Sequence, residues 1–224
     1  MKIAGQAAAT SVLGLLGLGV ILFVPAGTLN YWQAWVFIAV FTVGTQGPGI
    51  YLLVKNPAAL QRRMHAGPTA ETRFAQKLAV TGLFATAIGA MVISALDYRW
   101  AWSAVPLWVV VAGDVLVAVG LTMSQVVVIQ NSYAAANVTV EEGQELATTG
   151  LYGVVRHPMY VGVLIMSVGM PLALGSYWAL LTLIPCTAVL AVRILDEERA
   201  LEQQLAGYRD YMKDVRYRVV PYVW

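Results

Sequence analysis

The residues with the clearest chemical potential form a short cluster at the start of an apolar segment. The cluster consists of Tyr152, Arg156, His157 and Tyr160, within the stretch G-L-Y-G-V-V-R-H-P-M-Y-V-G at 150–162. Polar side chains at membrane depth are costly unless they bind a partner or a ligand. Pro158 is a favoured first residue of a helix, so the loop is expected to become a helix there. The cluster should therefore lie where water, headgroups and hydrocarbon meet, a place suited to joining a water-soluble cofactor to an apolar substrate.

A second group of charged residues follows the apolar segment. Arg193 and Glu197 are four residues apart in a stretch with helical character to about Leu205, so they should share one helix face. The alternative is an ordinary ion pair on a helix surface, which contributes little to stability. For Arg156 and His157 the corresponding alternative is an interfacial pair whose polar ends reach toward water.

The composition indicates an all-α integral membrane protein. The chain has 224 residues, of which 59% are hydrophobic and 12% are charged, whereas soluble domains carry about 25% charged residues. A formal net charge of +2 is too small to argue for nucleic acid. The single cysteine, Cys186, excludes a disulfide within the chain and is expected to be a buried thiol. The first apolar run lacks a convincing cleavage site, so we expect it to be a retained helix.

Apolar runs of about 20 residues mark the membrane spans. Four are expected, at roughly Ala8–Ala26, Tyr31–Val54, Leu78–Leu96 and Val105–Ile129. The apolar stretch from Met159 to about Val192 is too long for one span, and Pro171 and Gly175 interrupt it. It predicts a helical hairpin. The expected fold has about five transmembrane helices including this C-terminal hairpin, or six crossings if both arms pass through, plus a cytoplasmic C-terminal helix.

Two of the expected spans contain polar residues or a proline. Gln46 and Pro48 predict a kink or a partly polar face in the second span. Asp114 in the fourth is either a functional acid or a residue of helix packing, and packing is favoured. We divide the chain into N-terminal transmembrane helices at 1–130 and a cofactor-binding and catalytic region at 131–224.

Basic residues predict the orientation. They gather between the second and third spans and in the C-terminal tail. The first group is Lys55, Arg62, Arg63, Arg73 and Lys77, and the second is Arg193, Arg199, Arg209, Lys213, Arg216 and Arg218. Both groups can be cytoplasmic if the hairpin returns to its starting side. The N-terminus and the candidate site would then face the cytoplasm.

Residues 131–224 resemble the isoprenylcysteine carboxyl methyltransferase family of integral membrane methyltransferases. The resemblance rests on the 150–162 stretch, on R-I-L-D-E-E-R-A-L at 193–201, and on the tail G-Y-R-D-Y-M-K-D-V-R-Y-R-V-V-P at 207–221. The first two spans and N-P-A-A-L-Q-R-R-M at 56–64 look like bacterial members. The resemblance implies a protein of the bacterial inner membrane that uses S-adenosylmethionine as its cofactor.

The resemblance also implies roles for individual residues. Arg193 would face the substrate carboxylate. Apart from the resemblance, a carboxylate substrate needs an orienting cation, and Arg156 is in reserve as a second catalytic cation. The implied cofactor pocket consists of Asn137, Gln144, Glu145, Leu146, Ala147, Tyr152, His157, Pro158, Met159, Tyr160 and Glu197.

The residue types suit such a cofactor independently of the resemblance. Aromatic and apolar side chains such as Tyr152, Tyr160 and Leu146 can pack on the purine, and a cationic sulfonium is attracted to aromatic faces. The Glu197 carboxylate suits ribose hydroxyls or the ligand amine. The two histidines are too few for an all-histidine catalytic metal site, so no metal is expected.

We expect carboxyl O-methylation of a lipophilic or prenylated, isoprenylcysteine-like substrate. A carboxylate is already ionised near neutral pH, so it needs an orienting cation such as Arg193 rather than a base. One alternative is N-methylation of an amine phospholipid headgroup, which requires a base such as Glu197 or Glu198. Another is a non-catalytic membrane protein or transporter. The tail tyrosines Tyr208, Tyr211, Tyr217 and Tyr222 are expected to be interfacial anchors.

Overall fold

A computed structural model describes residues 2–55, 57, 60–61, 71, 73–131 and 145–224, and within these ranges every regular element is a helix. The α-helices are α1 (Lys2–Ala26), α2 (Trp32–Lys55), α4 (Phe74–Trp100), α5 (Leu107–Gln130), α6 (Pro158–Ala173), α7 (Leu183–Gln204) and α8 (Tyr208–Asp214). Two short 3-10 helices are η1 (Gly150–Gly153) and η2 (Trp178–Thr182). The all-α expectation is confirmed.

Within the described part of the chain, five helices are long and apolar enough to cross a membrane: α1, α2, α4, α5 and the continuous run of η2 and α7. The first hairpin arm, α6, has 16 residues and spans about 24 Å at 1.5 Å per residue. That is less than the roughly 30 Å of a hydrocarbon core. The expectation of about five transmembrane helices including a C-terminal hairpin is confirmed.

One local expectation needs revision. The charged stretch after the hairpin is not a separate helix, because α7 continues from its apolar start at Leu183 to Gln204. The separate C-terminal helix is α8, which has seven residues. Helix α2 continues through Pro48, and neighbouring groups can satisfy the backbone that a proline frees in a membrane helix. Gln46 contacts Ser11 of α1, which agrees with the expected partly polar face of this span.

Glycines bring α5 and α6 into backbone contact. A Cβ atom added at Gly120 would lie 2.5 Å from the carbonyl oxygen of Gly162, and one at Gly162 would lie 2.7 Å from that of Gly120. About two helical turns away, Gly113 of α5 and Gly169 of α6 make the same kind of close approach. Small residues allow membrane helices to pack this closely. The packing fixes the position of α6 along α5. It therefore also fixes the position of the residues at the start of α6.

The turn of the hairpin is tied to the loop between α4 and α5. Asp97 accepts hydrogen bonds from the backbone N–H and the hydroxyl of Ser103, both at 2.6 Å, and from the Ser176 hydroxyl at 2.5 Å. Gly175 takes a left-handed conformation with φ +73°, which glycine adopts without strain. These contacts anchor the end of the hairpin that lies farthest from Arg156 and His157.

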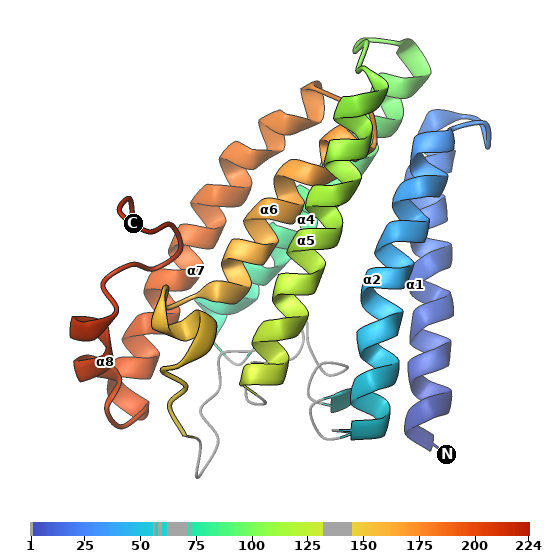
Figure 1. Ribbon diagram of the computed structural model, residues 1–224. Helices are drawn as coiled ribbons and strands as arrows, with labels where there is room; N and C mark the ends of the chain where they lie inside the picture. Colours follow the sequence, from blue (N-terminus) through green and yellow to red (C-terminus); the bar gives the residue numbers. More distant parts are fainter. Residues whose placement is uncertain (1, 56, 58–59, 62–70, 72, 132–144) are drawn as a thin grey trace.

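The polar ends of the helices gather at one end of the bundle. Figure 1 shows the N-terminus, the ends of α2, α5 and α7, the beginning of α4 and the short α8 at the lower end of the view. The described basic residues of the α2–α4 connection and of the tail therefore share one end. Both groups of basic residues can therefore face the same side of the membrane, as the sequence predicts.

Candidate functional site

The loop before α6 and the C-terminal tail are joined by their backbones. The N–H of Arg156 donates to the carbonyl of Tyr217, and the N–H of His157 donates to that of Arg218, both at 2.9 Å. Pro158 is the first residue of α6, as its ring geometry favours. The tail thus closes over the loop that presents Arg156 and His157.

Glu198 on α7 binds three cationic or potentially cationic side chains. One of its carboxylate oxygens accepts from Arg156 Nε at 2.7 Å and lies 3.2 Å from His157 Nε2, and the other accepts from Arg218 Nε at 2.8 Å. Arg156 Nη1 also donates to the carbonyls of Val215 and Arg216, each at 2.8 Å. The Arg156 guanidinium is therefore held by the protein's own acceptors, and its reserve catalytic role stays a prediction.

Tyr160 links Arg193 and Glu197. Arg193 Nε donates to the Tyr160 hydroxyl at 2.8 Å, and that hydroxyl donates to Glu197 Oε2. The Arg193 guanidinium also lies 5.9 Å from the centre of the Tyr160 ring. The two charged residues therefore share a face of α7, and a phenol bridges them. The arrangement joins the start of α6 directly to α7.

Arg193 also contacts a carboxylate that the sequence did not reveal. Its Nη2 lies 3.1 Å from Glu71 Oε1, and the two side chains are 5% and 1% exposed. Gln76, near the start of α4, donates to the backbone carbonyl of Arg193 at 3.2 Å and to Asp196 Oδ2 at 2.5 Å. Arg73 pairs with the same Asp196 oxygen at 3.1 Å. The start of α4 therefore holds α7 at the level of the site.

An aromatic and apolar cluster lies near these charged residues. Leu146 packs against a buried cluster that contains Tyr208 and Tyr211. The Tyr211 hydroxyl donates to the carbonyl of Tyr152 at 2.7 Å, and the Tyr152 hydroxyl accepts from Asn131 Nδ2 at 3.3 Å. Burial raises the pKa of Tyr152 to about 12, so its hydroxyl stays neutral and offers hydrogen bonds rather than charge.

Tyr208 and Tyr211 are not the interfacial anchors that the sequence suggested. They are only 3% and 5% exposed, whereas Tyr222 is 88% exposed. Both lie on the face of α8 that packs on Leu205 and Val215, and their spacing of three residues was the available signal. Burial raises the pKa of Tyr208, and the nearby carboxylates Glu198 and Glu197 add to this rise.

The remaining residues of the predicted pocket are dispersed or outside the described ranges. Asn137 and Gln144 lie outside the described residues. Glu145 is exposed, while Leu146 and Ala147 are half-buried. Met159 packs on Leu52, Leu60 and Val128. The structure thus gathers His157, Tyr160, Arg193 and Glu197 at the α6–α7 contact, and leaves their roles as predictions.

Asp114 belongs to a different part of the molecule. It is 8% exposed, and its neighbour Gly113 packs against Ala173, the last residue of α6. The candidate site lies at the first residues of the same helix. Asp114 Oδ1 is buried and has no hydrogen-bond partner within the described part of the chain. Its position agrees with a place in the helix packing.

Residues 108–207 match the model of the phospholipid methyltransferase family. Over these residues, a little under half of the chain, the sequence is similar to that family of membrane methyltransferases. The family segment runs from α5 to the turn before α8 and contains both the 150–162 stretch and the 193–201 stretch. The match supports the resemblance to integral membrane isoprenylcysteine carboxyl methyltransferases. The methyl donor and carboxyl methylation stay predictions.

A relative of a different kind shares part of this sequence. Over 85 residues the chain is 35% identical to the Delta(14)-sterol reductase TM7SF2 of Mus musculus. The similarity covers 37% of this chain and 20% of the mouse protein, so the chain spans only about a fifth of that relative. Because the relative is named a reductase, this partial similarity does not identify the reaction of the present chain.

Proposed function

We propose that the protein transfers a methyl group from S-adenosylmethionine to an acceptor dissolved in the membrane. The observation that carries the proposal is the meeting of α6 and α7 at Tyr160, whose hydroxyl contacts both Arg193 and Glu197. All three residues lie inside the methyltransferase family segment. The contact joins a polar, partly buried group to helices that border the hydrocarbon.

The residues present fit such a cofactor. The Tyr208 hydroxyl is buried and has no hydrogen-bond partner among the described residues, so it is available to a ligand's polar atom. The adjacent Leu146 offers an apolar surface, and the Tyr160 and His157 rings stack with centres 5.6 Å apart. Glu197 offers a carboxylate to hydroxyls or to an amine. When bound, S-adenosylmethionine supplies an electrophilic methyl group.

The proposed acceptor group is a carboxylate, and Arg193 is its orienting cation. The Glu71 contact supports this role, because a carboxylate already lies 3.1 Å from Arg193 Nη2 in a nearly dry environment. A planar guanidinium presents several donors in a fixed geometry and binds carboxylates well. An acceptor carboxylate would compete with Glu71 for these donors. Holding the acceptor in line and keeping water out are the tasks that remain to the protein.

Amine methylation is the second candidate, and the same residues provide its support. Glu71 and Glu197 are two carboxylates around one guanidinium and one phenol. If Glu71 stays bound to Arg193, the negative charges of Glu71 and Glu197 repel a carboxylate acceptor and attract an ammonium headgroup. An amine must lose a proton before it attacks. Its methylation should therefore rise with pH through the neutral range, whereas carboxylate methylation should be flatter.

The site is proposed to face the cytoplasm of a bacterial cell from its inner membrane. Support comes from the basic residues gathered at the end of the bundle where the site lies, since cytoplasmic loops of membrane proteins carry an excess of lysine and arginine.

A methyl-transfer assay with labelled S-adenosylmethionine tests the proposal. The acceptors are a prenylcysteine analogue, a fatty acid and an amine phospholipid, each presented in the same detergent. We expect transfer to a carboxylate acceptor and calorimetric binding of S-adenosylhomocysteine. Transfer to the amine lipid alone would establish the second candidate. No binding of S-adenosylhomocysteine by the folded protein would reject both and favour a non-catalytic membrane protein.

A further inference from the structure

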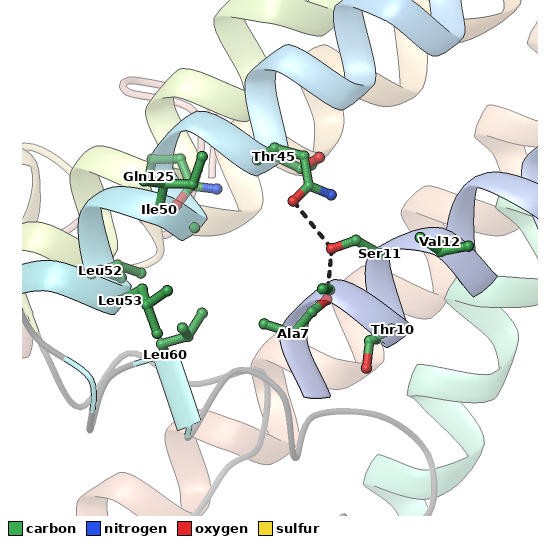
Figure 2. A pocket seen from close by; sticks show the side chains of 13 residues that line it. Ala7, Thr10, Ser11, Val12, Thr45, Ile50, Leu52, Leu53, Leu60 and Gln125 are labelled. Atoms are coloured by element: carbon green, nitrogen blue, oxygen red, sulfur yellow. Dashed lines mark hydrogen bonds between the residues drawn. The ribbon is translucent and has the colours of Figure 1, made fainter. Parts of the chain in front are cut away.

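A cavity of about 590 Å³ lies among α1, α2 and α5. Figure 2 shows Ala7 and Ser11 of α1 facing Leu52 and Leu53 of α2 across it, with Gln125 of α5 behind. The cavity is formed mainly by the first two helices, which precede the methyltransferase family segment. Its volume falls within the range of about 300–1,000 Å³ that is typical of ligand sites.

The surroundings of the cavity indicate a hydrocarbon occupant. Val12 and Ile50, which line it, are 56% and 63% exposed, and both lie within helices that are long and apolar enough to span the membrane. In a bilayer, the medium next to these side chains is lipid hydrocarbon. A chain from that medium can reach the cavity without crossing water.

Two of the polar side chains in the wall, Ser11 and Gln46, contact each other. The Ser11 hydroxyl lies 2.8 Å from the carbonyl of Ala7 and 3.1 Å from Gln46 Oε1, and Figure 2 draws both contacts. The contact with Gln46 joins α1 to α2, and the Ser11 hydroxyl is already engaged by these two partners. The rest of the lining is mainly aliphatic, which favours an alkyl or isoprenoid chain over a polar ligand.

The cavity lies near the start of α6. Leu52 lines it and forms with Val128 a buried cluster against which Met159 packs. Met159 lies in the first turn of α6, between His157 and Tyr160. A hydrocarbon chain in the cavity is therefore separated from the first turn of α6 by one layer of side chains, and the group attached to that chain can lie close to the site.

We propose that this cavity holds the hydrocarbon tail of the methyl acceptor. The inference rests on the proposed function, because it names the part of the protein that selects the acceptor by its tail. The first two helices then serve as the tail-binding part of the enzyme, and the helices of the family segment provide the cofactor and headgroup residues.

Two glycines in α2 allow a matched test. A Cβ atom added at either Gly49 or Gly47 would meet nothing within 4 Å, so both can accept a larger side chain without a backbone clash. Gly49 lines the cavity, whereas Gly47 is not among its lining residues and is exposed. Gly49→Leu should fill the cavity, and Gly47→Leu is its control. Ala8→Leu fills the same cavity from α1 and replaces Gly49→Leu if that variant folds poorly.

The first measurement compares two acceptors that share a headgroup but carry a long or a short tail. For Gly49→Leu we expect KM for the long-tailed acceptor to rise about tenfold or more, because several methylene groups lose their apolar contacts. KM for the short-tailed acceptor and binding of S-adenosylhomocysteine should stay unchanged. Gly47→Leu should match the unsubstituted protein with both acceptors. Equal KM values in the two variants for the long-tailed acceptor would overturn the inference.

The second measurement does not depend on turnover. A fatty acid with a diazirine in its alkyl chain is photoactivated with the protein in phosphatidylglycerol vesicles, and the labelled residues are mapped by mass spectrometry. We expect labels on Ile50, Leu53 or Val12 that Gly49→Leu loses and Gly47→Leu retains. Such labelling without methyl transfer to any acceptor would reject the proposed function and the acceptor assignment together. Normal turnover without labels in the cavity would reject the cavity assignment alone.

Discussion

At the scale of single residues, the site depends on how two arginines are used. Arg156 is bound by Glu198 and by two backbone carbonyls of the C-terminal tail. Its charge therefore holds the tail against the loop before α6. Arg193 contacts Glu71 and Tyr160, and its carboxylate partner comes from a distant part of the chain. This difference is why we assign acceptor binding to Arg193 rather than to Arg156.

Glu71→Gln separates the two candidate reactions. The amide keeps the shape of the side chain but removes the charge that competes for Arg193. For a carboxylate acceptor we expect KM to fall about threefold to tenfold, because the guanidinium becomes easier to reach. For an amine acceptor we expect kcat/KM to fall, because the site loses negative charge.

Steady-state kinetics with both acceptor types measure these changes. Glu202→Gln is the matched control, since that carboxylate is 4.0 Å from Arg209 and far more exposed. An unchanged KM for every acceptor in Glu71→Gln would contradict a role for Glu71 at the site.

Arg193→Lys tests the orienting role. Lysine keeps the charge but offers a point-like ammonium in place of the planar guanidinium. We expect kcat/KM to fall about a hundredfold or more, while S-adenosylhomocysteine binds with nearly unchanged affinity in calorimetry. Normal turnover by Arg193→Lys would show that the guanidinium geometry is not needed.

Glu198→Ala should destabilise the fold. The substitution leaves Arg156 buried without its carboxylate, and removing one partner of a buried ion pair costs about 3–5 kcal/mol. We expect a clear fall in the thermal unfolding temperature in detergent. Asp210→Ala removes an exposed carboxylate that pairs with Lys213 and should leave that temperature unchanged. Equal unfolding temperatures for the two variants would argue against Glu198 as a structural centre.

At the scale of the elements, the backbone contact of α5 and α6 determines where the site residues lie. Gly120 and Gly162 allow the two helices to approach closely, and Pro158 starts α6 at the level of the α7 carboxylates. The starts of α4 and α6 both contact α7. The site is therefore formed by the starts of α4 and α6 and by one face of α7, and not by a single motif.

Gly162→Val tests this packing. The added side chain meets the carbonyl of Gly120 and the hydroxyl of Ser124 at under 3 Å, so α6 must shift. Overpacking of this kind costs about 1–3 kcal/mol, and we expect lower thermal stability together with lost turnover. Gly89→Val on α4 is the control, because a Cβ there meets nothing within 4 Å. Full activity of Gly162→Val would show that the site tolerates a displaced α6.

At the scale of the whole molecule, the helix ends that form the site lie at the end of the bundle where the described basic residues gather (Figure 1). The tail returns from α8 to cover the loop before α6. The opposite end carries the Asp97 contacts and the hairpin turn. One end therefore carries the candidate chemistry, and the other holds the helices in register.

Cysteine labelling tests the proposed orientation. In a Cys186→Ala background, Arg209→Cys and Trp102→Cys place exposed thiols at opposite ends of the bundle. In sealed inverted membrane vesicles an impermeant maleimide should label the thiol at 209 and not the one at 102. The reverse pattern would contradict a cytoplasmic site.

The sequence by itself determined the features that depend on neighbouring residues. Hydropathy is a local sum, so the membrane spans and the hairpin were predictable from composition along the chain. The start of α6 at Pro158 and the common face of Arg193 and Glu197 were predictable because proline geometry and helical periodicity are local.

Only the tertiary structure decided which groups the charged side chains contact. Glu71 and Arg193 are 122 residues apart, and Arg156 and Glu198 are 42 apart. Such pairs depend on how closely the helices pack, as at Gly120 and Gly162, and on the burial that makes an unpaired charge costly. The burial of Tyr208 and the cavity beside Met159 arise in the same way, because both depend on which helix faces meet in space.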